Sequence, residues 1–219
     1  DVACIGEKAN ATRPEIEQIM LFDPDQRDLA VQDRDLYVIR RRIEKAAIAA
    51  QIPDLYICSL SARSIIYKGM FLAEHLTEFY PDLLDARFAS RFAIYHQRYS
   101  TNTFPTWRLA QPFRMIAHNG EINTLSGNVN WMKSHETRLA APALDPYMDD
   151  IKPVIQAGGS DTAILDNVFE VLVRAGRDAP MAKALMIPES IGNNATMPES
   201  HRALFLYCNA VMEPWDGPA

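Results

Sequence analysis

Asn119 and Gly120 stand at the end of an apolar stretch, within the run His-Asn-Gly-Glu-Ile-Asn at positions 118–123. An asparagine side-chain amide and the backbone N–H of the following glycine are two donors that can converge on one developing oxyanion. Glycine suits this role because, without a Cβ, its backbone can approach a substrate closely. Asn-Gly between apolar runs is also the strongest short signal for a hairpin turn, so the pair alone fits either interpretation.

Polar residues on either side of this pair complement the two charged ends of an amino acid. Arg98 follows a strand-like run, and its planar guanidinium can bind a carboxylate through two parallel hydrogen bonds. Asp161 opens a helical pattern, and its carboxylate can accept hydrogen bonds from an ammonium group. Each residue also has a structural alternative, since Arg98 can pair with an acidic neighbour and Asp161 can be a helix N-cap.

A resemblance to a known family rests on one long segment, HQRYSTNTFPTWRLAQPFRMIAHNGEINTLSGNVNWM. Shorter segments along the rest of the chain agree with the same family: IEQIMLF, RRRIEK, YICSLSARSIIYKG, GGSDTAILDN and MEPWDGPA. Together they resemble the glutaminase domain of glutamate synthases, which are class II glutamine amidotransferases with an N-terminal nucleophile. The resemblance covers essentially the whole chain.

The resemblance implies a role for each candidate residue, with L-glutamine as the substrate. Asn119 and Gly120 would stabilise the oxyanion. Arg98 and Thr101 would bind the substrate carboxylate, and Asp161 would bind the ammonium group. Thr101 also has an alternative, because a threonine hydroxyl can cap a loop backbone.

The resemblance also implies a fold and an activity. We expect an α+β domain built as a partial four-layer αββα sandwich of the N-terminal nucleophile hydrolase type, with strands in the first half and helices covering them. The intact domain would hydrolyse L-glutamine to glutamate and ammonia, and the ammonia would pass to a synthase site that makes glutamate from 2-oxoglutarate.

Cofactors and further partners are implied only for the full-length protein. They are FMN, an iron–sulfur cluster and a reduced donor, either NAD(P)H or ferredoxin, together with the remaining domains of the chain and a small electron-donating subunit. No residue of this chain is expected to bind these cofactors. Two alternatives stay open: a non-catalytic glutamine-binding or regulatory domain, and another class II amidotransferase that acts on a sugar phosphate or on phosphoribosyl pyrophosphate.

The chain departs from the family pattern at its first residue. Enzymes of this class begin with a cysteine whose own α-amino group serves as the base, whereas residue 1 here is Asp1. We therefore expect residues 1–219 to form a single incomplete domain, a fragment that lacks the nucleophile and the C-terminal part of the domain and is inactive alone. Cys4, exposed by trimming, is a weaker alternative, because it falls where the family pattern is already well inside the domain.

Composition indicates a cytoplasmic protein. The net charge of −6 and pI of about 5.4 argue against nucleic acid as a partner. There is no apolar run of membrane length and no signal peptide. The three cysteines have no metal-ligand spacing, so no metal is expected. The basic run 40–42 is interpreted as a solvated helix face.

Apolar spacing predicts the secondary structure. The expected helices are 31–50, 72–80, 125–139, 162–175, 179–186 and 198–211. The expected strands are 16–22, two short ones within 55–68, 88–99 and 113–117. Pro142, Pro146 and Pro153 predict a loop without helix. Cys58, Cys208 and Trp131 are expected to be buried.

Overall fold

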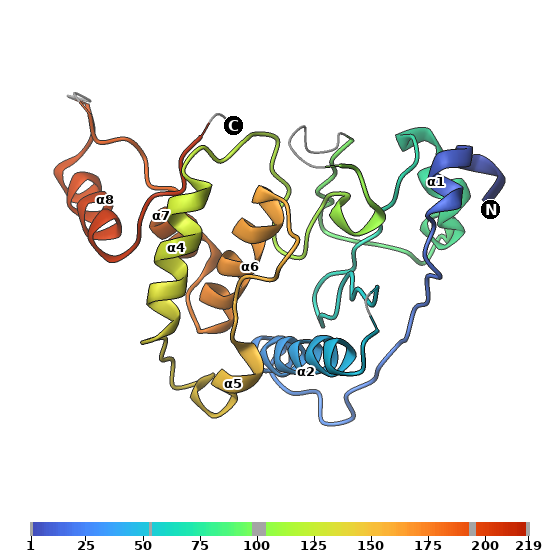
Figure 1. The fold of residues 1–219 in the computed structure, drawn as a ribbon, viewed down its shortest axis with the longest axis horizontal. Helices are drawn as coiled ribbons and strands as arrows, with labels where there is room; N and C mark the ends of the chain where they lie inside the picture. The colour runs from blue at the N-terminus through green and yellow to red at the C-terminus, as the bar shows by residue number, and fades with distance from the viewer. Residues whose placement is uncertain (1, 53, 98–103, 193–195, 218–219) are drawn as a thin grey trace.

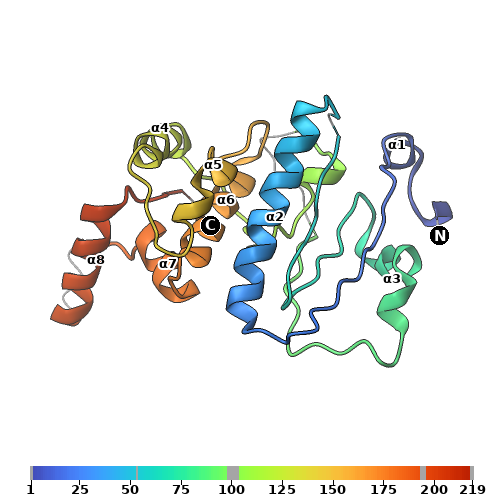
Figure 2. The ribbon, with the colours of Figure 1, turned by 90° about the horizontal axis from the view of Figure 1, so that it is seen from below.

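The structure is a computed structural model that describes residues 2–52, 54–97, 104–192 and 196–217. Figure 1 shows an elongated molecule, with helix α1 (Glu7–Ala11) at one end and helix α8 (Glu199–Val211) at the other. A long helix, α2 (Leu29–Ala49), lies between these ends. Figure 2 shows the extended segments of the N-terminal half between α2 and α3 (Leu76–Phe79).

The remaining elements are short or belong to the C-terminal half. The longer helices are α4 (Leu125–Glu136), α6 (Asp161–Arg174) and α7 (Ala179–Met186). The short elements are η1 (Val2–Cys4), η2 (Ala73–His75), η3 (Pro81–Leu84), η4 (Trp107–Leu109), η5 (Asp145–Tyr147) and α5 (Met148–Ile151).

Helix α6 is the centre of the hydrophobic core. Its residues Leu165, Val168 and Val171 are at most 2% exposed, and they belong to one apolar cluster with residues of α2, α4 and α7. Burying such side chains stabilises each by about 1.5–3 kcal/mol, so this cluster fixes α6 relative to its neighbours.

Five of the six helix predictions are confirmed, because each depended on local spacing that the packing reinforces. The predicted helix 72–80 is confirmed only in part, because it consists of the 3-10 turn η2 and the four-residue helix α3. Helix α2 begins at Asp28, whose carboxylate accepts hydrogen bonds from the amides of Ala30 and Val31. The prediction that the proline-rich stretch lacks helix was wrong in part. Pro146 lies in the first turn of η5, where a missing N–H costs nothing, and α5 follows directly.

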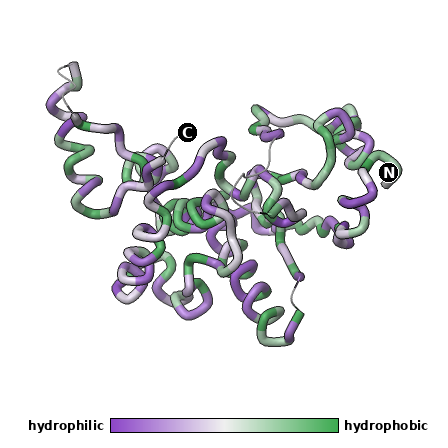
Figure 3. The backbone as a smooth tube through the Cα atoms, turned by 45° about the horizontal axis from the view of Figure 1, so that its top comes forward, coloured by the Kyte–Doolittle hydropathy of each residue, from purple (hydrophilic) through white to green (hydrophobic). Residues whose placement is uncertain are grey.

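The strand predictions were wrong for this structure, because none of the described residues forms a β-ladder. Within 55–68, Ile66 donates its amide to the Ser59 hydroxyl and accepts a hydrogen bond from the Cys58 thiol, so side chains replace backbone pairing. The segment 16–22 is extended and its apolar side chains face solvent, Met20 being 84% exposed. Figure 3 shows such apolar stretches, in green, in the half of the molecule that contains the N-terminus.

The interpretation of 40–42 as a solvated face was also wrong for two of the three arginines. Arg40 and Arg41 are 1% and 4% exposed. Arg40 pairs with Glu44 at 2.8 Å and with Glu170 of α6 at 2.5 Å, and Arg41 pairs with Glu44 at 2.7 Å. The guanidinium groups are buried because carboxylates on α2 and α6 neutralise them, an arrangement that composition alone does not reveal.

The three residues that were expected to be buried differ in their exposure. Cys208 is fully buried, as predicted. Cys58 is only partly buried, and Trp131 is 53% exposed and stacks on His135 one turn later, so its assignment to the core was wrong. No helix among the described residues is long and apolar enough to cross a membrane.

Substitutions of Arg40 and Arg42 in α2 test the contribution of the buried ion pairs to stability. Arg40→Met is expected to lower the free energy of unfolding by about 3–5 kcal/mol, because it leaves Glu170 buried without its cationic partner. Arg42→Met is the matched control, since Arg42 is exposed and pairs with Asp150 at the surface, where solvent screens the interaction. Denaturant unfolding of both variants measures the difference, and equal losses would contradict the assignment.

Candidate functional site

The segment 111–124 contains the predicted oxyanion pair and runs along the beginning of α6. Gln111 fixes the residue just before that pair. Its side-chain amide donates to the carbonyl of His118 at 2.8 Å and accepts from the amide of His118 at 2.8 Å. The glutamine side chain thus supplies both hydrogen bonds that a neighbouring strand would otherwise provide.

A carboxylate of α6 holds the middle of the same segment. Asp166 is fully buried, and its oxygens accept hydrogen bonds from the amides of Arg114, Met115 and Ile116 at 3.3, 2.8 and 3.1 Å. Burial raises the pKa of Asp166 to about 6, and the negative Glu170 one turn away adds to the increase. The donated amides oppose this increase because they favour the charged carboxylate.

The predicted Asp161 holds the segment after the pair. Its side chain accepts from the amide of Ile122 at 3.2 Å and from the amide of Thr162 at 2.6 Å, and the residue is only 8% exposed. Asp161 is not the N-cap of α6. That role belongs to Ser160, whose hydroxyl accepts from the amide of Ala163 at 3.2 Å. The N-cap alternative for Asp161 is therefore wrong.

The last described residues close the other side of the turn. The amide of Asn123 donates to the carbonyl of Asp216 at 2.8 Å, and the amide of Asp216 donates to the Thr124 hydroxyl at 2.9 Å. Gly217 lies so close to Glu121 that a Cβ built on it would be 1.8 Å from that residue's carbonyl oxygen. Only glycine fits at this contact.

Asn119 itself remains available. It is exposed, and within the part of the chain that the structure describes its side chain makes no hydrogen bond. A two-residue type I′ hairpin would require positive φ at both Asn119 and Gly120. Among the described residues other than glycine, those with positive φ are Gln26 and Gln51, so Asn119 does not have the φ that this turn needs. The turn at Asn119 and Gly120 is therefore not a type I′ hairpin turn.

The residues that the sequence predicts for the site and those that the structure places around the turn are only partly the same. The structure brings Asn119 and Gly120 together with Asp161 through the short connection to Ile122. Arg98 and Thr101 lie outside the described residues, so their roles stay predictions. Sequence reasoning missed Gln111 and Asp166. Each is a polar residue beside apolar ones, which was the available signal. The backbone partners of Asp166 are about fifty residues away, whereas the partner of Gln111 is seven residues away.

The cysteines form no obvious reactive centre. Cys4 and Cys58 are partly buried and Cys208 is buried. Burial raises the pKa of the Cys58 thiol, which disfavours the reactive thiolate. Among the described residues, no group of three or more His, Cys, Asp or Glu side chains could hold a metal ion.

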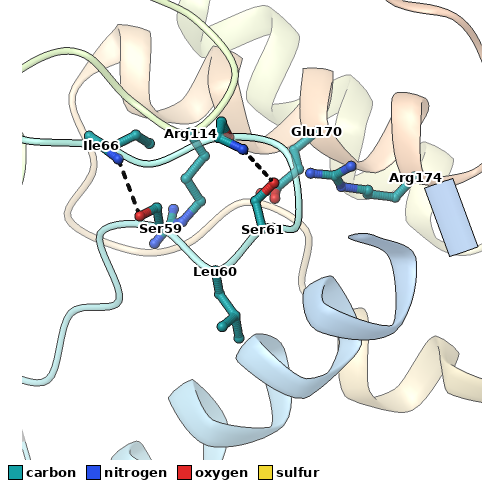
Figure 4. A pocket seen from close by; sticks show the side chains of 8 residues that line it. Ser59, Leu60, Ser61, Ile66, Arg114, Glu170 and Arg174 are labelled. Carbon is teal, nitrogen blue, oxygen red and sulfur yellow. Dashed lines mark hydrogen bonds between the residues drawn. The ribbon is translucent and has the colours of Figure 1, made fainter. Parts of the chain in front are cut away.

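A small cavity beside α6 is separate from the turn. It is lined by Ser59, Ser61, Arg114, Glu170 and Arg174, and Figure 4 shows these side chains between the 59–66 segment and the helix. Its volume of about 10 Å³ is close to the minimum for one water molecule, so it cannot contain an amino acid.

Comparison with known proteins gives the same family along the whole chain. The family described as Glutamine amidotransferases class-II matches residues 1–219. The chain is 67% identical over 219 residues to the glutamate synthase [NADPH] large chain of Azospirillum brasilense and 42% identical to that of Bacillus subtilis. It is 43% identical over 223 residues to the ferredoxin-dependent glutamate synthase of rice, Oryza sativa.

These matches cover all of this chain but only 14% of the length of each of these relatives. The family match, by contrast, extends over every residue from 1 to 219, including the turn at 118–123 and the beginning of α6. The chain therefore belongs to the class II glutamine amidotransferases.

Proposed function

We propose that this chain supplies the glutamine-binding and oxyanion-stabilising part of the glutaminase site of a glutamate synthase. The observation that carries the proposal is the turn at 118–123. It is fixed by Gln111 on one side and by Asp161 and Asp216 on the other, while the amide of Asn119 stays free to meet a ligand. Donors that are fixed in advance need no reorganisation when charge develops on a substrate.

Each residue has a distinct task in this proposal. Asn119 and the amide of Gly120 donate to the γ-carbonyl oxygen of glutamine as it becomes tetrahedral. Asp161 accepts from the substrate ammonium, while Arg98 and Thr101 bind the substrate carboxylate. Asp161 can combine this task with its bond to Ile122, because a carboxylate has about four lone-pair sites.

The attacking group would be a cysteine thiol activated by its own α-amine, as the family resemblance implies. No residue of this sequence matches that cysteine. The products would be glutamate and ammonia, and the ammonia would react at a separate synthase site with 2-oxoglutarate. FMN, an iron–sulfur cluster and a reduced donor would act at that second site.

We also propose that the intact domain forms the four-layer αββα sandwich and acts in the cytoplasm. Family membership supports the sandwich, and so do the apolar side chains that 16–22 and 88–95 expose here, such as Phe22 at 82% and Phe92 at 76%. Exposed apolar side chains in extended segments suit strands that a second layer covers. The remaining domains of a glutamate synthase chain and a small electron-donating subunit are the proposed partners.

The role of Asn119 is tested by Asn119→Ala in the intact protein. We expect kcat for glutamine hydrolysis to fall by about 10²–10³ with KM nearly unchanged, because the lost donor acts only on charge present in the transition state. Steady-state ammonia release measures both constants. A loss of thermal stability with normal turnover would instead indicate a purely structural turn, and a non-catalytic binding domain would release no ammonia even before mutation.

The role of Asp161 is tested by Asp161→Asn, with Ser160→Ala as the matched control on the same helix end. Asparagine keeps the shape of Asp161 but not the charge that meets the ammonium, so KM for glutamine should rise strongly. Ser160→Ala removes the cap of α6 and should cost about 1 kcal/mol of stability with little effect on KM. If the two variants have the same kinetics, Asp161 does not bind the substrate.

The Cys4 alternative is tested by Cys4→Ser. The nitrogen of Cys4 is a peptide amide within η1, so it has no free α-amine to act as a base. Ammonia release by the intact protein should therefore be unchanged in this variant. Loss of activity would identify Cys4 as the nucleophile after trimming.

A further inference from the structure

Three cations surround the ring of Tyr56. The Lys68 ammonium nitrogen lies 4.6 Å from the ring centroid, and the guanidinium carbons of Arg114 and Arg108 lie at 5.1 and 5.8 Å. A ring face attracts a cation by about 0.5–2 kcal/mol. Like charges around one ring also repel one another, so this arrangement requires a negative charge nearby.

The described residues do not supply enough of that charge. Glu44 contacts Arg114 at 3.4 Å, but it is shared with Arg40 and Arg41 at shorter distances. Lys68 is 7% exposed, and the hydrogen bonds of its ammonium group go to neutral acceptors, the Tyr56 hydroxyl and a backbone carbonyl, both at 2.9 Å.

Arg108 has no ion pair with any described residue, and its side chain is exposed. Burial lowers the pKa of Lys68 to about 8, and the neighbouring Arg114 and Arg108 add to the decrease. Another carboxylate that acts on Lys68, that of Asp166, already accepts three backbone amides. The positive charge around Tyr56 is therefore in excess.

A cavity lies next to these cations. Its volume is about 20 Å³, and its lining includes Tyr56, Arg108, Phe113, Arg114, Gln156 and Gly159. The Arg114 side chain is only 7% exposed, and its Nε is buried with no hydrogen-bond partner in the described chain. Leaving such a charged donor unsatisfied is costly, and an acceptor that reaches the Arg114 guanidinium would remove that cost.

From this geometry we infer a binding site for one carboxylate group, held between the guanidinium groups of Arg108 and Arg114 beside the Tyr56 ring. A carboxylate matches the planar fork of an arginine and can accept from two guanidinium groups at once. The cavity has room for a water-sized group such as one carboxylate oxygen, and the exposed Arg108 leaves room for the rest of the molecule outside. The inference does not depend on the proposed glutaminase activity.

Formate is the probe, because it is a carboxylate with no further substituent. In the intact protein, the line width of ¹³C-formate is measured against protein concentration, with sodium chloride keeping the ionic strength constant. We expect saturable broadening in the wild type and a loss of affinity of about tenfold or more in Arg108→Gln, since one charge-assisted hydrogen bond is removed. Arg108 is exposed, so this variant should fold.

Arg87→Gln is the matched control, because Arg87 is an exposed arginine that pairs with Asp85 and does not line the cavity. Its formate affinity should equal that of the wild type. L-glutamate is added in a second titration: displacement of formate identifies an amino-acid carboxylate as the source, and no displacement identifies a free small acid. Absence of broadening in the wild type, or equal broadening in Arg108→Gln, would overturn the inference.

Discussion

The carboxylate of Asp166 is the constraint on which the candidate site depends. The residues before the oxyanion pair form no ladder with another described strand, so their amides need other acceptors. One buried carboxylate accepts three consecutive amides, those of residues 114–116, and orients the chain that leads to Asn119. Removing it would leave these donors without partners, at a cost of about 1–3 kcal/mol for each buried group.

The same helix determines the position of both flanks of the turn. Asp166 acts before Asn119 and Asp161 acts after it, and both project from α6, whose apolar face is the centre of the core. A helix changes shape far less readily than a loop, so donors attached to it at two points keep their separation. The precision of the site therefore derives from the burial of Leu165, Val168 and Val171, which never contact a substrate in this proposal.

Whether a structural feature could be predicted from the sequence depends on how far apart in the chain the interacting residues lie. The helices depend on contacts three and four residues apart, which the apolar spacing records, and they were predicted with nearly correct bounds. The Arg40–Glu170 pair joins residues 130 positions apart, and the spacing of charges along α2 carries no sign of it. The strands failed for a related reason, since a segment such as 16–22 becomes a strand only when another segment pairs with it.

The candidate site shows the same division. Asn119, Gly120 and Asp161 could be predicted as site residues because their types and order match a known chemistry, and their roles stay predictions. Gln111 and Asp166 were missed because they bind backbone amides and carbonyls. Nearly every residue has these groups, so residue types do not reveal which of them is bound. Asp161 combines both categories, because it is a predicted ligand and also binds the amide of Ile122.

The contact between Gly217 and Glu121 has a consequence for the order of events during synthesis. The hydrogen bonds of Asp216 to Thr124 join residues 92 positions apart, so the ribosome must add nearly a hundred residues after the turn before its last tether exists. Until then the amides of residues 123 and 124 have only water as a partner. The nascent chain thus carries an unfinished site while the 92 residues from Thr124 to Asp216 are added, and any ligand present at that time meets a turn that is still open on one side.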